Sequence, residues 1–239
     1  MAAPGKRKIG TKTKKPRDGG RSLAGRSDVK ERLLNASLSL FATAGYNAVG
    51  VKEIVDKAGV PKGSFYAYFR SKEALGCAVI DRYSQMSGGR LRALTAPDDR
   101  PVERLRRHFA ELSQDVAAAD FLSGCLLGRF STETTGQSEP MRQRLLQRFA
   151  DWTKALAQVV SEAAARQQLL AALTPKDAAT FLLNSWEGAV LRARVDRDRA
   201  PLDVFEKVAF ASLFKREERS PTRTSQAQSP SRKKGQFNE

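Results

Sequence analysis

The chain has 239 residues and a formal net charge of +16, from 42 lysines and arginines against 26 acidic residues. This length allows one or two domains with a sizeable core, and the charge favours a polyanionic partner, because neutralised phosphates release counterions. No apolar run approaches the roughly 20 residues of a membrane span. The N-terminus lacks the apolar stretch of a secretory signal, and two cysteines without a CxxC pair exclude a disulfide framework. We therefore expect a cytoplasmic protein.

Both ends of the chain are basic and poor in large apolar residues. Residues 1–27 carry nine lysines and arginines against the single acid Asp18, and residues 217–239 are rich in Ser, Gln, Arg and Lys. Neither segment can bury enough apolar surface to offset the entropy lost on ordering. We predict a disordered basic arm and a disordered tail on either side of a folded body.

The first predicted helix spans residues 28–44, where apolar side chains recur at helical spacing. Ser27 or Asp28 is its expected N-cap, and Gly45 stands where a left-handed C-cap is favoured.

Three further helix boundaries follow at short intervals. A second helix at about 51–58 stops at Gly59, and Pro61 takes the first position of a third helix, where its missing N–H costs nothing. Ser71 is the expected N-cap of a fourth helix, in which Cys77 is a packing residue.

Two short helices joined at Gly59 predict a helix-turn-helix, in which the first helix braces a second that meets base edges. Phe65 and Phe69, four residues apart, are expected to anchor the second helix in the core. The candidate DNA contacts lie at the start of that helix and at the N-terminus of the next one; they are Lys62, Gly63, Ser64, Tyr66, Tyr68 and Lys72. The alternative is an ordinary helical hairpin with solvated side chains.

Longer amphipathic helices are predicted at about 104–119, 141–165, 175–195 and 202–214. No β-type alternation of useful length occurs, so the predicted fold is all-α. The last two helices carry more apolar surface than one side of a bundle can cover, and an apolar stripe of that size marks an interface. Pairing them with a second copy predicts a four-helix dimer seam, in which Gly188 allows close approach.

Four ordered strings carry a family resemblance: Phe41-x-x-x-Gly45-Tyr46, Ile54-x-x-x-Ala58-Gly59-Val60, Lys62-Gly63-Ser64-Phe65-Tyr66-x-Tyr68-Phe69 and Lys72-Glu73-x-Leu75. Through them, residues 28–83 resemble the DNA-binding domain of the TetR-type transcriptional repressors. The resemblance implies that residues 84–216 form a helical ligand-binding and dimerisation domain. It also implies a homodimer on a palindromic operator, with recognition helices about 34–36 Å apart, and release when a ligand swings the fourth helix.

Two further strings, Gly124-Cys125-Leu126-Leu127-Gly128 and Trp186-Glu187-Gly188-Ala189-Val190-Leu191-Arg192-Ala193, resemble a subgroup of these repressors. That subgroup responds to acrylate or to electrophiles such as N-ethylmaleimide, and its cysteine after the first glycine is the candidate sensor. The implied sensor here is Cys125, whose thiol pKa Arg129 would lower if the segment is helical. The alternative is a buried, inert cysteine.

Other side chains of the second domain are candidates for an effector site, although aromatic residues at helical spacing are more often core. They are Arg129, Glu133, Trp152, Asn184, Trp186 and Glu187. His108, the single histidine, is expected to be exposed. With no nucleophile–base pair and no phosphate loop, the sequence predicts no catalytic centre, metal site or cofactor.

The main hypothesis is a homodimeric repressor that binds double-stranded operator DNA and is released by a small molecule or an electrophile. Three alternatives stay open: a constitutive DNA-binding protein with no effector, an enzyme with a basic surface, and a tail-driven binder of RNA or an anionic membrane surface. The basic arm has two interpretations, additional phosphate or minor-groove contacts and a solvated tail.

Overall fold

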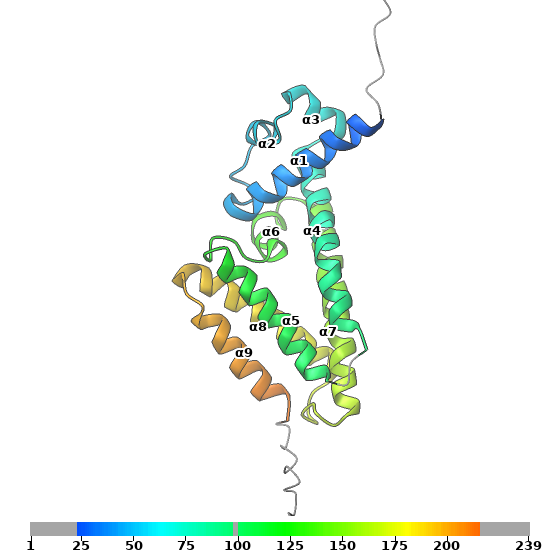
Figure 1. The fold of residues 1–239 in the computed structure, drawn as a ribbon, viewed down its shortest axis with the longest axis vertical. Helices are drawn as coiled ribbons and strands as arrows, with labels where there is room; N and C mark the ends of the chain where they lie inside the picture. Colours follow the sequence, from blue (N-terminus) through cyan, green and yellow to red (C-terminus); the bar gives the residue numbers. More distant parts are fainter. Residues whose placement is uncertain (1–22, 98–99, 216–239) are drawn as a thin grey trace, which may run out of the picture.

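The computed structural model describes residues 23–97 and 100–215, and within them the chain forms nine α-helices and no β-strand (Figure 1). The helices are α1 (Leu23–Ala44), α2 (Val51–Ala58), α3 (Lys62–Tyr68), α4 (Lys72–Thr95), α5 (Pro101–Ala118), α6 (Leu126–Thr134), α7 (Glu139–Ala165), α8 (Pro175–Asp196) and α9 (Ala200–Leu213). The prediction of an all-α fold is confirmed. The predicted tail and most of the predicted arm lie outside the described residues.

Two helix boundaries differ from the prediction. α1 begins at Leu23, so Ser27 and Asp28 lie inside the helix instead of capping it. Ser and Asp favour caps but do not exclude a helix interior, and a local cap signal cannot stop a helix that continues upstream. Pro61 is the N-cap of α3 instead of its first helical residue, with an extended ψ of 143°.

The other capping signals act as predicted. Gly59 ends α2 with a φ of 62°, in the left-handed region that a glycine adopts without strain. Ser71 caps α4, because its hydroxyl oxygen accepts a hydrogen bond of 3.0 Å from the backbone N–H of Ala74. These two signals set the length and position of the short helix α3 between them.

Helices α1 to α3 and the start of α4 share one small core. This core contains four side chains with no exposed surface: Phe41, Ile54, Phe65 and Leu75. The burial of Phe65 confirms that it anchors α3 in the core. Cys77 is buried in α4, as expected for a packing residue.

α4 connects this small unit to the rest of the molecule (Figure 1). Its 24 residues span about 36 Å at 1.5 Å per residue. The helix runs through the predicted domain boundary at residue 83 and contains Gly88 and Gly89 in its interior. One continuous helix therefore joins the body to the residues near Ser71.

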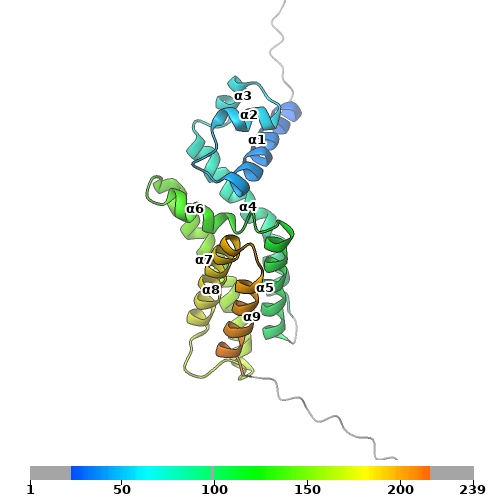
Figure 2. The same cartoon turned by 90° about the vertical axis from the view of Figure 1, so that its left-hand side faces the viewer.

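The body is a helical bundle built from the lower part of α4 and from α5, α7, α8 and α9 (Figures 1 and 2). Its centre is aromatic: the rings of Phe109 and Phe205 lie 5.1 Å apart, and those of Trp152 and Trp186 lie 5.7 Å apart. α6 was not predicted, because its nine residues form a helix too short for apolar spacing alone to identify. No helix in the described ranges 23–97 and 100–215 is long and apolar enough to cross a membrane.

α8 and α9 lie side by side (Figure 2), and both helices carry exposed apolar side chains, which we call the uncovered apolar face. Val195 is 78% exposed and Val208 is 52% exposed, far above the values for buried valines such as Val190 at 2%. At Gly188 a Cβ atom would meet no neighbouring atom within 4 Å, so the surface there is open. The remaining exposed apolar residues of this face are Phe181, Leu191 and Val204.

Candidate functional site

The outer face of α3 is polar, aromatic and accessible. Tyr66 is 60% exposed, Lys62 is exposed beside it, and nothing lies within 4 Å of a Cβ built at Gly63. Ser64 and Tyr68 are half-buried at the edges of this face. The structure thus places the five predicted α3 contacts on one short helix, whose opposite side is held by buried phenylalanines.

Lys72, the sixth predicted contact, lies in the first turn of α4, where the helix dipole favours an anion. Its Nζ atom lies 4.3 Å from the centre of the Tyr46 ring, within cation–π range. Burial lowers the pKa of the Lys72 ammonium, while Glu133 and Glu53 act in the opposite direction. The cation–π contact with Tyr46 therefore helps to hold the Lys72 ammonium in place at the start of α4.

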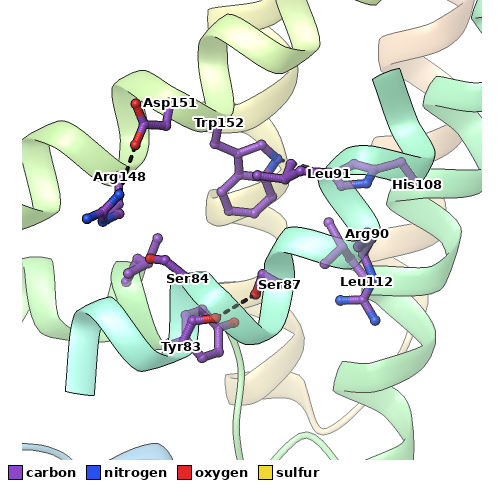
Figure 3. Close-up of a pocket in the computed structure, with 11 residues that line it drawn as sticks. Tyr83, Ser84, Ser87, Arg90, Leu91, His108, Leu112, Arg148, Asp151 and Trp152 are labelled. Atoms are coloured by element: carbon purple, nitrogen blue, oxygen red, sulfur yellow. Dashed lines mark hydrogen bonds and ion pairs between the residues drawn. The ribbon is translucent and has the colours of Figure 1, made fainter. Parts of the chain in front are cut away.

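A cavity of about 130 Å³ lies in the body between α4, α5 and α7 (Figure 3). One wall is polar, with Ser84 and Ser87 on α4 and with Arg148 and Asp151 on α7, which form an ion pair at 3.1 Å. The other lining residues are Tyr83, Arg90, Leu91, His108, Leu112, Leu127 and Trp152. Of the predicted effector residues, only Trp152 lines this cavity.

His108 is buried, so the prediction that it is exposed was wrong. It faces α7, where the indole N–H of Trp152 donates a hydrogen bond of 3.1 Å to its Nε2 atom. An accepting Nε2 requires the neutral ring with its proton on Nδ1. Burial, together with the nearby Arg90, lowers the pKa of His108 to about 4 and keeps the ring neutral.

Cys125 is the N-cap residue of α6 and is buried. Burial and the neighbouring Glu187 raise the pKa of its thiol well above the usual value, so the expected lowering by Arg129 was wrong. Burial also raises the pKa of Glu187, to about 7. The Glu187 carboxyl lies against Gly128, where a Cβ would come within 3.1 Å of its Cδ atom. The buried thiol and the half-buried Glu187 side chain are neighbours between α6 and α8.

A second cavity, of about 220 Å³, reaches from Cys125 and Trp186 to the DNA-binding unit. Leu38 and Ala42 of α1 form its far side, and α4 and α5 supply most of the remainder. The second cavity therefore lies between the α1–α3 unit and the body.

Arg129 and Glu133 do not line either cavity, contrary to the prediction for an effector pocket. The guanidinium of Arg129 donates hydrogen bonds of 3.1 and 3.0 Å to the carbonyls of Ala42 and Thr43 at the end of α1. Their place at the junction of the two units follows from tertiary packing, which residue type alone does not predict. Asn184, another pocket candidate, is exposed on α8.

Comparison with known proteins agrees with both halves of this architecture. Residues 33–79 match the family described as bacterial regulatory proteins, tetR family, and residues 101–209 match the tetracyclin repressor-like C-terminal domain. The HTH-type transcriptional repressor DhaR of Mycobacterium sp. is 35% identical over 190 residues, which cover 79% of this chain and 94% of that protein. The chain belongs to the TetR family. The similarity includes the transcriptional regulator AcuR of Cereibacter sphaeroides, with 34% identity over 74% of this chain and 81% of that protein.

Solved structures of TetR-family regulators have the same fold. The regulatory protein TetR from Rhodobacter sphaeroides superposes with a TM-score of 0.73 at 33% identity. The superposition covers 77% of this chain and 98% of the Rhodobacter chain. The reduced form of Escherichia coli NemR gives a TM-score of 0.68 at 29% identity, covering 78% of this chain and 98% of that chain.

In this TetR-family chain, sequence reasoning missed most of the first cavity. Ser84 and Ser87, and likewise Arg148 and Asp151, are pairs spaced three residues apart, so each pair shares one face of its helix. Polar pairs on the inward side of helices α4 and α7 were the available signal. These pairs can be recognised as cavity-lining residues only when the structure shows which side of each helix faces inward.

Proposed function

We propose that the protein is a repressor that binds a palindromic operator as a homodimer and is released when a small molecule occupies the first cavity. The observation that carries the proposal is the arrangement along α4. The exposed face of α3 lies near the N-terminal end of α4, and Ser84 and Ser87 of the same helix line the cavity. A ligand that shifts α4 would therefore reorient α3.

The α3 surface supports DNA reading in two ways. Lys62 and Ser64 have donors of the kind that reach base edges in the major groove, and Lys72 at a helix N-terminus suits a phosphate. The names of the relatives DhaR and NemR, both transcriptional repressors, support the same role. They also support a regulatory and non-enzymatic function, in the cytoplasm, where DNA is accessible.

The uncovered face of α8 and α9 supports a two-fold dimer. Burying Val195 and Val208 against a second copy removes apolar surface from water, and at Gly188 two helices can approach closely. A two-fold axis then places two copies of α3 on one side of a duplex.

The first cavity favours a small ligand with an apolar part and a polar part. Leu91, Leu112 and Trp152 suit the apolar part, and the hydroxyls of Ser84 and Ser87 suit the polar part. The ligand must bind the non-DNA conformation more tightly, since equal affinity for both conformations shifts nothing.

Modification of Cys125 by an electrophile is a second candidate trigger. The supporting observation is the second cavity, which extends from Cys125 to Leu38 and Ala42 of α1. A thiol that adds to N-ethylmaleimide forms a C–S bond and transfers its proton to the neighbouring carbon. The adduct would then lie between the body and the DNA-binding unit.

The first experiment selects binding sites from a random DNA library with the purified full chain. We expect an inverted repeat, and Lys62→Ala or Tyr66→Ala should reduce its preference over random DNA by about 1–3 kcal/mol. Lys154→Ala, an exposed lysine on α7, is the matched control. Recovery of no inverted repeat, or equal preference in all variants, would contradict the proposed DNA-binding surface.

The second experiment tests release. A compound screen by thermal shift should yield ligands that stabilise the protein and dissociate the DNA complex, and Trp152→Ala should weaken this response. If the thiol is the trigger, N-ethylmaleimide should dissociate the wild-type protein from DNA and leave the DNA complex of Cys125→Ala intact. DNA binding that no ligand and no electrophile affects would favour the constitutive alternative.

A further inference from the structure

We propose that Arg129 and Glu133 of α6 are positioning residues for operator recognition, which fix the orientation of α3 by holding residues 42–47 against the body. The argument depends on hydrogen bonds that cross from α6 to the end of α1 and the loop that follows it. The proposal rests on the proposed function in one respect, the binding of a homodimer to two operator half-sites.

Glu133 holds the loop after α1 through two hydrogen bonds to Asn47. One carboxylate oxygen accepts a hydrogen bond of 3.0 Å from the backbone N–H of Asn47, and the other accepts one of 3.0 Å from Nε of Arg129. The Asn47 side-chain amide also donates to the backbone carbonyl of Glu133 at 3.2 Å. With the two bonds from Arg129 to Ala42 and Thr43, these contacts satisfy backbone groups on both sides of Gly45.

The ion pair between Arg129 and Glu133 is partly shielded from water. Their side chains are 16% and 22% exposed, so the pair is less screened than a surface pair such as Arg142–Glu139, at 42% and 63%. The backbone of Gly45 lies close to this ion pair. Gly45 has a φ of 93°, and a Cβ there would come within 2.9 Å of an Arg129 guanidinium nitrogen. The two surfaces therefore fit closely at Gly45.

Tyr46 connects this junction to a candidate phosphate contact. Its ring packs between Phe41 and Phe130 of α6, with ring centres 5.4 and 5.8 Å away, and its face supports Lys72 at 4.3 Å. Tyr46 therefore packs against α6 and Lys72 at the same time.

The N-terminal end of α6 contacts the body. Gly128, one residue before Arg129, lies under the Glu187 carboxyl of α8, and Cys125 caps the same helix. A nine-residue helix thus contacts Glu187 of the body near its N-terminus and the DNA-binding unit through Arg129 and Glu133. The attachment through α6 is separate from the covalent connection through α4.

The two attachments have different consequences for DNA. An α3 helix joined only through α4 would still bind one half-site, because its own contacts are intact. The spacing between the two α3 helices of a dimer would be less well defined. Loss of the α6 attachment should therefore reduce selectivity for half-site spacing more than affinity for a single half-site.

The test uses full-length Glu133→Ala, with Glu139→Ala as the control, because Glu139 forms an exposed ion pair with Arg142 on α7. The probes are the inverted repeat recovered by selection, the same duplex with one or two base pairs inserted at its centre, and a duplex with one half-site. Glu133→Ala should lower affinity for the inverted repeat roughly tenfold, which is about 1.4 kcal/mol, and should change half-site affinity less than twofold. Glu133→Gln, which retains an acceptor for the Asn47 N–H, should restore part of the spacing preference.

An equal loss on all duplexes would overturn the proposal, because it would indicate general destabilisation. Unchanged spacing preference would overturn it as well. Hydrogen exchange at Gly45–Asn47 provides a DNA-independent measurement: faster exchange in Glu133→Ala than in Glu139→Ala supports the attachment, and equal exchange contradicts it. If the wild type itself selects no inverted repeat, the proposed function fails, and the exchange comparison still decides whether α6 holds this loop.

Discussion

Protonation of the buried His108 is expected to lower the free energy of unfolding as the pH falls below 6.5. The pKa of its ring is about 4 in the folded protein and 6.5 in the unfolded chain. Between these values the unfolded state binds more protons, so stability rises with pH and is lost on acidification. The full window corresponds to about 3 kcal/mol, of which about 2 kcal/mol is lost between pH 7 and pH 5. The cause is the burial of the ring together with the nearby Arg90, which lower its pKa. A proton on Nε2 would also face the indole N–H of Trp152.

Glu187 has the opposite dependence over nearly the same range. Burial raises the pKa of its carboxyl from 4.5 to about 7, so the folded state binds more protons between these values. Its contribution, also about 3 kcal/mol, is present at acid pH and is lost as the pH rises towards 7. The two groups therefore offset each other in the wild type, and each should become visible when the other is removed.

The assay is urea denaturation of three proteins from pH 5 to pH 7.5. His108→Gln retains an acceptor for Trp152 and should become more stable relative to wild type as the pH falls. Glu187→Gln should become less stable relative to wild type over the same interval. Parallel profiles for wild type and His108→Gln would refute the assignment of a neutral buried imidazole. Since the chain has one histidine, no second ring can produce the difference.

Two further substitutions test the junction and the apolar face. Gly45→Ala places a Cβ at a φ of 93° and within 2.9 Å of Arg129, so we expect a loss of about 1–3 kcal/mol in urea denaturation. Gly63→Ala, where no atom lies within 4 Å, is its control and should be neutral or slightly stabilising. Val208→Glu places a charge on the uncovered face and should shift the protein to monomers in sedimentation velocity. Gln158→Glu on α7 should leave the distribution unchanged.

The short helices near the N-terminus were predictable because their signals are local. Gly59 supplies a left-handed turn and Ser71 a side-chain acceptor, and each acts within one turn of the chain. Phe65 and Phe69 are spaced for one face of a helix, and both are buried. The position of α3 therefore followed from the sequence, as did the exposure of Lys62.

The functional surfaces of the body depended on neighbours far along the chain. Arg129 was expected to activate the thiol of Cys125, one turn away, yet it bonds to carbonyls in α1. His108 reads as a polar residue on an arginine-rich helix, and only its contact with Trp152, 44 residues later, explains its burial.

The sequence by itself determined the all-α class, the turn at Gly59 and the polar face of α3, because helix periodicity and capping act over a few residues. Only the tertiary structure decided which side of α4, α5 and α7 encloses a cavity and which charges meet at the junction of the two units. The physical reason is that burial and ion pairing depend on the distance between side chains in space, and residue spacing along the chain does not specify that distance.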